Sequence, residues 1–197
     1  ILFGNNNILA LDIGSRLIKT VYAKGGKRGI SVLNAGICET PRGSFLDGSI
    51  SDKSSIASAV RDMISSLNIK PKSVIIGIKG QDIIMRQIEM PPMPAKQLRQ
   101  AVKLEIQQYL PMDPNEYIID SKIIDKIDSK DKKAYNVLLV AAPKEKVNDY
   151  IYIAERLELK VLAVDLFANS VVRLFGDAND SGGKTFCVID MGFSSST

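Results

Sequence analysis

Histidine is absent from the 197 residues, and cysteine occurs only twice, at Cys38 and Cys187. Without imidazole, the chain cannot build a His-based catalytic triad, a His metal site or a His general base. The two cysteines lie far apart and outside any C-x-x-C pattern, so we expect neither a thiol metal site nor a disulfide framework, as is typical of a reducing compartment. No run approaches 18 apolar residues and the first seven residues are too short for a secretory signal, so we expect a cytoplasmic protein with no membrane span.

The overall composition is that of a globular protein with a mildly basic surface. Hydrophobic residues make up 45% of the chain and charged residues 24%, which argues against extended disorder. The formal net charge of +4 is compatible with an anionic membrane surface, a nucleic acid or a nucleotide as partner, but it selects none of them.

The most informative stretch is residues 8–19 (ILALDIGSRLIK). Its first four residues form an apolar run that is too short for a helix and typical of a buried strand. Asp12 follows at the exposed end, Gly14 and Ser15 form a tight turn, and residues 17–22 return as a second strand. Lys19 lies seven residues after Asp12, on this return strand, where its ammonium group can act as a point charge.

The same order of features recurs in residues 186–197 (FCVIDMGFSSST), where an apolar run, predicted as a strand, leads into Asp190, Gly192 and several hydroxyl residues. Glycine permits close backbone approach, hydroxyls donate hydrogen bonds to phosphate oxygens, and a carboxylate can hold a hydrated Mg²⁺. We therefore predict that the two turns converge on one phosphate group. The predicted phosphate ligands are Asp12, Gly14, Ser15, Lys19, Asp190, Gly192, Ser194, Ser195, Ser196 and Thr197, and Asp12 and Asp190 are the predicted carboxylates for a metal held through water.

Between these turns the periodicity predicts an α/β chain with an insert. Strands are expected at 30–38, 73–78 and 84–90, and a helix capped by Ser51 or Asp52, which together give a βββαββ sheet with a crossover helix. Prolines at 91, 92 and 94 mark a boundary. Beyond it we expect a compact α-β-β-α-β insert over 91–164: helix 95–110, strands 117–124 and 135–142 joined by the charged loop 125–133, a helix opening at Pro143, and strand 159–164. A short helix at 167–175 then precedes the second turn.

A nuclease with an RNase H-like fold is an alternative interpretation of these carboxylates. Such an enzyme also begins with a β-hairpin that carries an acid on its first strand, and Asp12 and Asp190 would be two of its metal ligands. A two-metal site needs several converging acids, and no third acid lies at a predicted core strand end. Nucleotide binding is therefore the favoured interpretation.

The order of elements and the two turns together resemble the actin-like ATPase superfamily. Residues 12–15 with Lys19 are similar to its phosphate-1 motif, and residues 190–197 are similar to phosphate-2. Within the FtsA-like branch of that superfamily, the chain most resembles the PilM family of type IV pilus assembly proteins, through residues 104–113 (LEIQQYLPMD), 137–143 (VLLVAAP) and 157–168 (LELKVLAVDLFA).

The resemblance implies a fold and a domain division. It implies an actin-like (RNase H-like) subdomain 1A over residues 1–90 and 165–185, and an FtsA-type 1C insert over 91–164. Residues 186–197 would begin a second lobe, so we expect the front half of a longer protein. Position 16 is Arg where actin has glycine, and the adenosine motifs of the family belong to the second lobe. We therefore expect the chain alone to bind ATP weakly or not at all.

The resemblance also implies a function. It implies a cytoplasmic scaffold, peripheral at the inner membrane, that binds ATP with Mg²⁺ between two lobes and serves pilus biogenesis and twitching motility. Its partners would be other pilus platform proteins and the N-terminal tail of PilN, held in a groove between subdomains 1A and 1C, with no nucleic acid. Another FtsA- or GspL-like scaffold of cell division or secretion is an alternative.

The resemblance also bears on the hydrolysis of ATP. Superfamily members orient the attacking water with a polar residue at the start of the helix before phosphate-2, and Asn169 lies nearest to that place. An amide is a poor base, so we expect slow ATP hydrolysis or none, with the nucleotide setting the interlobe conformation.

Overall fold

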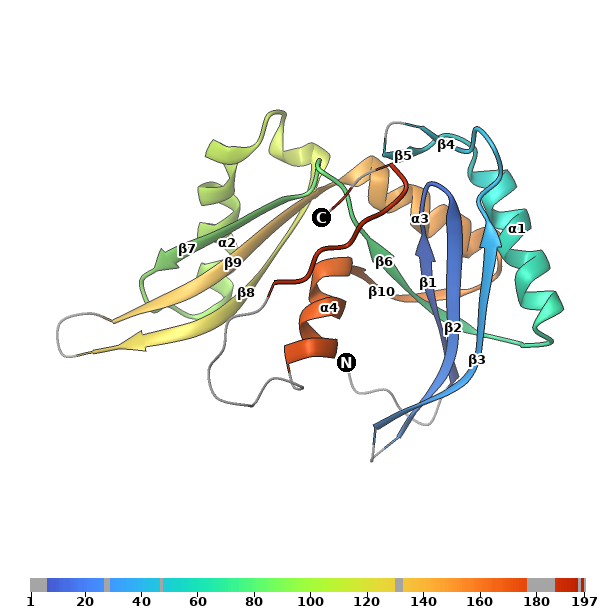
Figure 1. Ribbon diagram of the computed structural model, residues 1–197. Helices are drawn as coiled ribbons and strands as arrows, with labels where there is room; N and C mark the ends of the chain where they lie inside the picture. The colour runs from blue at the N-terminus through green and yellow to red at the C-terminus, as the bar shows by residue number, and fades with distance from the viewer. Residues whose placement is uncertain are drawn as a thin grey trace. The chain divides into compact units, whose positions relative to one another are not determined.

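A computed structural model of the chain describes residues 7–26, 29–46, 48–129, 133–176, 187–194 and 196 (Figure 1). The fold is α/β, and the chain divides into two compact units. The first unit comprises Ile1–Lys79 with Asn148–Thr197, and the second unit is Gly80–Val147. Among the described residues, no helix combines the length and the apolarity needed to cross a bilayer.

The first unit is built on a five-stranded mixed sheet with the order β10-β6-β1-β2-β3. Neighbours β1, β2 and β3 pair antiparallel, whereas β1 with β6 and β6 with β10 pair parallel. The predicted N-terminal hairpin is confirmed, with Ile13 opposite Ile18 next to the turn. The strands are β1 (Asn7–Ile13), β2 (Leu17–Gly26), β3 (Gly29–Glu39), β6 (Ser73–Ile78) and β10 (Lys160–Leu166).

The central strands bury one face of the sheet beneath a helix, and the side chains on that face are apolar. Every second residue of β6, from Val74 to Ile78, is buried, as are Leu9 and Leu11 of β1. Helix α1 (Lys53–Ser66) covers one face through four buried residues: Ile56, Ala57, Val60 and Met63. The predicted cap is confirmed, because the Asp52 carboxylate accepts the Ser55 N–H at 3.0 Å.

The approach of α1 to β3 depends on a glycine. A Cβ atom built on Gly36 would lie 2.8 Å from Cδ1 of Leu67, the residue that ends α1. Any larger residue would therefore require the side chains of Leu67 and Met63 to move. The side-chain amide of Asn34, two residues earlier on β3, donates to the Leu67 carbonyl at 3.2 Å and fixes the same contact.

Two further helices belong wholly or partly to the first unit. Helix α3 (Lys144–Arg156) enters it at Asn148, and its Asp149 accepts a hydrogen bond from Lys53 of α1 at 2.7 Å. Helix α4 (Phe167–Gly176) follows β10 directly. A small hairpin pairs β4 (Phe45–Leu46) with β5 (Ser49–Ile50).

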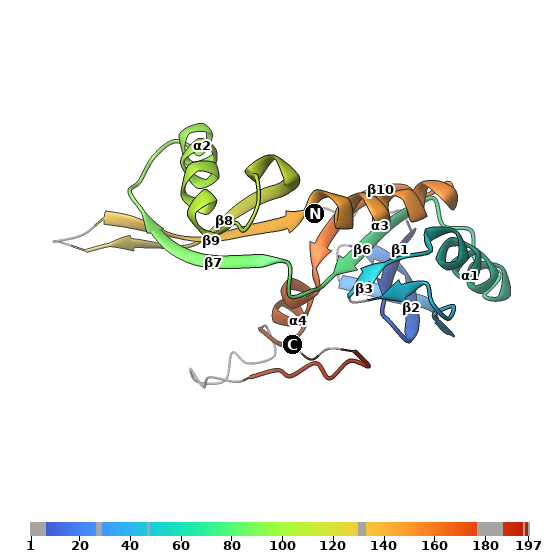
Figure 2. The same ribbon diagram turned by 90° about the horizontal axis from the view of Figure 1, so that it is seen from above.

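The second unit is a three-stranded antiparallel sheet with the order β7-β9-β8, and helix α2 lies along one of its faces (Figure 2). Its elements are β7 (Ile84–Met90), α2 (Ala95–Glu105), the 3-10 turns Ile106–Tyr109 and Pro114–Glu116, β8 (Tyr117–Asp128) and β9 (Lys133–Pro143). Its core joins the inner side of the helix to the strands and consists of Met90, Leu98, Val102, Ile106, Tyr117, Val137, Leu139 and Ala141. The predicted helix and strands are confirmed, but residues 125–128 of the expected charged loop continue β8.

Two strands pair differently from the sequence prediction. Residues 84–90 were expected to extend the first sheet, yet β7 pairs with β9, from Ile84 with Ala141 to Met90 with Tyr135. Residues 159–164 were expected in the insert, yet β10 pairs with β6 in the first sheet. The compact units consequently change at Gly80 and Asn148 rather than at residues 91 and 165. Apolar alternation identifies a strand but carries no information about its partner.

The predicted strand before the second turn is wrong for residues 187–190, which have no regular secondary structure. Phe186 lies outside the described residues. In the described part of residues 187–196, an isolated antiparallel β-bridge pairs Met191 with Ser196. The side chains of Ile189, Met191 and Phe193 are 68–81% exposed. No strand in the described ranges pairs with residues 187–190, and an extended apolar segment needs such a neighbour to become a buried strand.

Candidate functional site

The carboxyl ends of three neighbouring parallel strands, β1, β6 and β10, lie side by side in the first sheet. Asp12 of β1 lies beside Gly77 of β6, and Asp165 of β10 lies on the other side of the same glycine. A Cβ atom on Gly77 would have no neighbour within 4 Å, so the glycine leaves open space between the two carboxylates. Carboxyl ends of parallel strands are where open α/β sheets bind their ligands. Asp12 therefore occupies the expected place for a ligand-binding acid, and Asp165 is a second acid that the sequence reasoning missed.

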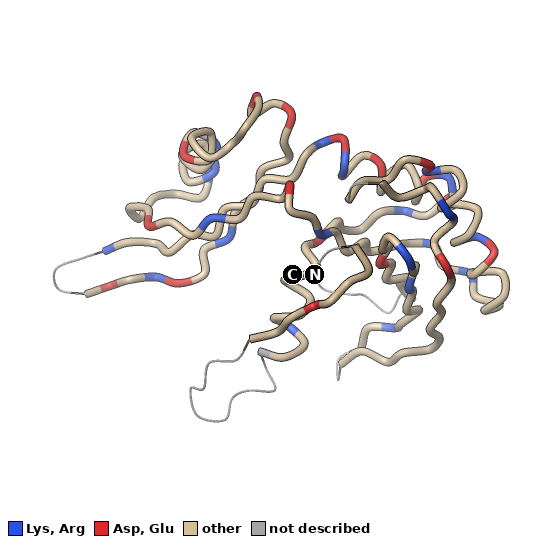
Figure 3. Tube along the Cα trace, turned by 45° about the horizontal axis from the view of Figure 1, so that its top comes forward, with Lys and Arg blue, Asp and Glu red and all other residues tan. Residues whose placement is uncertain are grey.

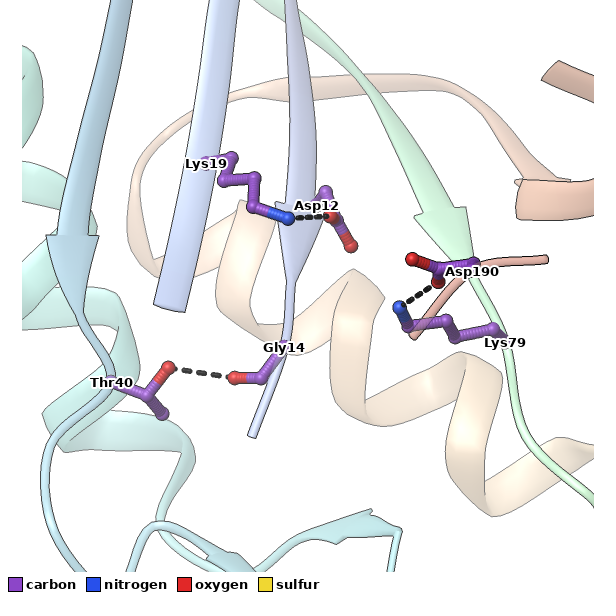
Figure 4. A network of polar contacts seen from close by, with 6 residues as sticks. All are labelled: Asp12, Gly14, Lys19, Thr40, Lys79 and Asp190. Carbon is purple, nitrogen blue, oxygen red and sulfur yellow. Dashed lines mark hydrogen bonds and ion pairs between the residues drawn. The ribbon is translucent and has the colours of Figure 1, made fainter. Parts of the chain in front are cut away.

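The seven-residue spacing of Asp12 and Lys19 makes them cross-strand neighbours. The two residues face each other across the hairpin, and the Lys19 ammonium lies 3.6 Å from the Asp12 carboxylate (Figure 4). More than half of the Lys19 side chain is exposed, whereas a quarter of the Asp12 side chain is. The lysine is therefore accessible to a ligand at the hairpin turn.

The turn itself is held by backbone bonds and by one buried threonine. The Gly14 N–H donates to the Leu17 carbonyl at 3.0 Å, and a Cβ on Gly14 would lie 2.9 Å from that oxygen. The hydroxyl of Thr40, just after β3, donates to the Gly14 carbonyl at 2.6 Å, as Figure 4 shows. The Thr40 N–H also donates to the Arg16 carbonyl at 2.8 Å. Thr40 was not predicted, since nothing in its local sequence points to a turn some 26 residues earlier.

The second turn is tied to the end of β6. The Lys79 ammonium lies 2.8 Å from the Asp190 carboxylate, and both side chains are about three-quarters buried (Figure 4). The same ammonium lies 4.9 Å from the centroid of the Phe167 ring, on α4. Lys79 was also missed, although a lysine directly after a buried strand was a usable signal.

The two turns converge, as the sequence predicted. The Ser194 hydroxyl donates to the Ser15 hydroxyl at 2.8 Å, between residues 179 positions apart. The Arg16 guanidinium carbon lies 5.1 Å from the centroid of the Phe193 ring and adds a second contact between the same segments. Of the other predicted phosphate ligands, Gly192 and Ser196 lie in the described part of this loop, whereas Ser195 and Thr197 lie outside the described residues.

Asn169 is engaged with Asp165. Its side-chain amide donates to the Asp165 carboxylate at 2.8 Å, and the Leu166 N–H donates to the same oxygen at 2.8 Å. The Arg173 guanidinium lies 3.4 Å from the other carboxylate oxygen. The amide therefore helps to hold Asp165 at the end of β10, and its catalytic role stays a prediction.

The assembled groups suit an anion together with a hydrated cation. Lys19 and Lys79 supply positive charge, Ser15 and Ser194 supply hydroxyl donors, and the carboxylates supply ligands for water-held Mg²⁺. In the described ranges, no three Cys, Asp or Glu side chains cluster closely enough to bind a metal directly. The donor set thus fits the predicted phosphate and water-mediated metal, and that use of the site stays a prediction.

The chain is similar to solved structures from pilus biogenesis and from type II secretion. A chain of a PilM–PilN type IV pilus biogenesis complex superposes with a TM-score of 0.85 at 21% identity, over 98% of this chain and 57% of that one. The cytoplasmic domain of EpsL, an inner-membrane component of the Vibrio cholerae type II secretion system, superposes with a TM-score of 0.53 at 13% identity, over 81% of this chain and 57% of that one.

These likenesses bear on the fold. The predicted α/β, actin-like fold class is confirmed. The chain spans little more than half the length of these two relatives. A search of curated proteins found no match. The profile of the family described as type IV pilus assembly protein PilM matches residues 10–197. The chain therefore belongs to the PilM family of type IV pilus assembly proteins.

Proposed function

We propose that the chain belongs to an actin-like scaffold of the type IV pilus assembly platform, and that its two converging turns bind the phosphates of ATP with Mg²⁺. The hydrogen bond between Ser15 and Ser194 carries this proposal, because it joins the two predicted phosphate turns through groups that can each bind a phosphate oxygen. Membership of the PilM family supports the scaffold role.

The charges around the turns support phosphate as the ligand. Lys19 and Lys79 each lie beside a carboxylate. A bound phosphate would contact the two ammonium groups, and a hydrated cation would contact the neighbouring carboxylates. Asp12 and Asp190 would hold the water shell of Mg²⁺, and the two lysines with the serine hydroxyls would contact phosphate oxygens. Bound Mg²⁺ would neutralise phosphate charge.

The expected role of the nucleotide is conformational rather than catalytic. Asn169 donates its amide to Asp165 and has no basic group with which to activate water. We therefore propose slow hydrolysis or none, with ATP favouring one conformation of the scaffold by binding it more tightly than the alternatives.

The proposed partner is the N-terminal tail of a PilN-like inner-membrane protein. The solved structure with a TM-score of 0.85 is described as a PilM–PilN complex, and this is what supports the choice. Binding to such a tail would place the chain on the cytoplasmic side of the inner membrane, in contact with the other platform proteins.

The phosphate proposal is tested by ligand-observed saturation-transfer NMR of MgATP, which detects the weak binding expected of this chain alone. Lys19→Gln removes one charge-assisted hydrogen bond to phosphate, worth about 1.5–3 kcal/mol, so affinity should fall at least tenfold. Lys126→Gln is the matched control, because it removes the same charge from β8 in the second unit. Inorganic pyrophosphate should displace the ATP signal. Equal losses in the two variants, or no displacement, would show that binding does not use the turns.

The partner proposal needs a separate experiment. Fluorescence anisotropy of a labelled peptide with the N-terminal tail sequence of the PilN-like protein from the same source should rise on addition of the 197-residue chain. A scrambled peptide of equal charge is the control. Failure here would remove the partner and leave the phosphate proposal standing.

A further inference from the structure

The side chain of Arg16 has no role in the proposed phosphate site, although Arg16 lies in the first turn between the predicted ligands Ser15 and Lys19. Its backbone is fixed, because its carbonyl oxygen accepts the Thr40 N–H at 2.8 Å. Its guanidinium carbon lies 5.1 Å from the centroid of the Phe193 ring, within the roughly 6 Å over which an aromatic face attracts a cation. The arginine of one turn is therefore paired with the aromatic ring of the other.

The second turn gains little from burial or from charge. The side chains of Ile189, Met191 and Phe193 are 68–81% exposed, so burial of apolar area contributes little to holding them in place. The described residues of 187–196 carry one charged side chain, Asp190, and this segment is otherwise tan in Figure 3. An aromatic ring attracts a cation without carrying a charge of its own. Phe193 thus gives this segment a means of binding the arginine of the first turn.

The proposed ligand would compete with two other contacts of the second turn. The Ser194 hydroxyl donates to Ser15 at 2.8 Å, and it must release that oxygen before it can donate to a phosphate. The Lys79 ammonium lies 2.8 Å from the Asp190 carboxylate, and in the proposed site the lysine contacts phosphate while the carboxylate holds the hydrated cation. The contact between arginine and phenylalanine uses none of these groups. It can therefore persist in both the free and the bound chain.

We propose that Arg16 and Phe193 form a positioning pair, which holds the second turn against the first both before and after phosphate binds. This inference rests on the proposed function of the two turns. A site whose halves are already together binds its ligand without the cost of ordering one of them. Loss of the pair would let the turns separate in part of the population, and the apparent affinity would fall with the fraction that stays closed. An exposed cation–π contact shifts such an equilibrium about two- to fivefold, which is the largest loss of affinity that we expect.

The first test needs no ligand and uses the absence of tryptophan from the chain. Phe193→Trp places a single fluorophore at the contact and keeps an aromatic face for the guanidinium, because tryptophan is the ring that binds cations best. In time-resolved fluorescence anisotropy, adding Arg16→Gln should increase the amplitude of the fast local motion of this tryptophan, and Arg16→Lys should reverse part of that increase. The control is Phe175→Trp on α4, another partly exposed ring, whose anisotropy should not respond to Arg16→Gln. Equal amplitudes with arginine and with glutamine at position 16 would overturn the proposal.

The second test measures the affinity for magnesium pyrophosphate by NMR titration. Arg16→Gln and Phe193→Leu should each weaken binding about two- to fivefold, and Phe193→Leu should have no further effect in the Arg16→Gln chain, because both changes remove the same contact. Phe193→Tyr keeps the aromatic face and should keep the affinity. The matched control is Arg86→Gln, which removes the same charge from a comparable contact of the second unit, 5.5 Å from the centroid of the Tyr109 ring. This control should bind pyrophosphate as the unmodified chain does.

The two tests separate the positioning pair from its alternatives. Weaker binding in Arg16→Gln together with unchanged binding in Phe193→Leu would make the arginine a direct phosphate ligand and would overturn the proposal. Losses that add in the double variant would overturn it as well. Failure of the unmodified chain to bind pyrophosphate would instead refute the proposed function, and the anisotropy would then decide by itself whether the pair holds the turns together.

Discussion

Replacement of Thr40 by valine tests how the first turn is held. Valine keeps the shape of threonine but removes the hydroxyl that donates to the Gly14 carbonyl at 2.6 Å. Thr40 is 7% exposed, so water cannot readily take over the lost bond. The backbone bond from the Thr40 N–H to the Arg16 carbonyl is kept in the variant. The change therefore isolates one side-chain hydrogen bond at the turn.

The expected cost follows from that single bond. A typical intramolecular hydrogen bond contributes about 0.5–1.5 kcal/mol, and an acceptor left unpaired adds to the loss. Because the Gly14 backbone is partly exposed, we expect the free energy of unfolding to fall by about 1–2 kcal/mol. For a domain of this size, such a loss lowers the melting temperature by roughly 2–8 °C.

The assay is urea unfolding followed by circular dichroism, with Thr40→Ser as the control. Serine keeps the hydroxyl and loses only the methyl group, so it should retain most of the stability that valine loses. If the valine variant were as stable as the unmodified protein, or if serine were the less stable of the two, the hydroxyl would not hold the turn.

Three other predictions concern the first unit. Gly36→Val should lower the free energy of unfolding by about 1–3 kcal/mol, because its Cβ would lie 2.8 Å from Cδ1 of Leu67 at the end of α1. Gly77→Ala should keep the stability of the unmodified chain in urea titrations, because no atom lies within 4 Å of the added Cβ. Hydrogen bonds from Ser55 lower the pKa of the Asp52 carboxyl, so this cap stabilises the fold above the unfolded-state pKa and loses its effect as pH falls through the folded-state value. Asp52→Ala should consequently lower the melting temperature more at neutral pH than at about pH 2. Burial, with a smaller effect of a nearby carboxylate, raises the pKa of the Cys38 thiol. Iodoacetamide should therefore modify Cys38 slowly at neutral pH and faster above the ordinary pKa of a thiol. Mass spectrometry of a Cys187→Ser variant measures this reaction at Cys38 alone.

Local pattern was sufficient where the interacting groups are close in sequence. The Asp12–Lys19 pair follows from a hairpin of known turn length, and the Asp52 cap follows from a hydroxyl or carboxylate before a helical repeat. The convergence of Ser15 with Ser194 is the exception among the long-range contacts, and it was predictable because the two turns share one motif.

Long-range partners were not available from local pattern. Thr40 and Lys79 act on turns that lie far away in the sequence, and no local pattern identifies those turns as their partners. The same reason explains the strand errors: β7 and β10 were recognised as strands, but their sheets were assigned by sequence order. Sequential strands are often neighbours in space, and here that general tendency failed.

The central claim is that the turns at residues 12–19 and 190–197 form one anion site, and amide NMR tests it most directly. In a titration of the labelled chain with magnesium pyrophosphate, the Gly14 and Gly192 amide signals should both shift and should saturate with one common dissociation constant. Separate constants for the two glycines, or a shift confined to one of them, would contradict the account.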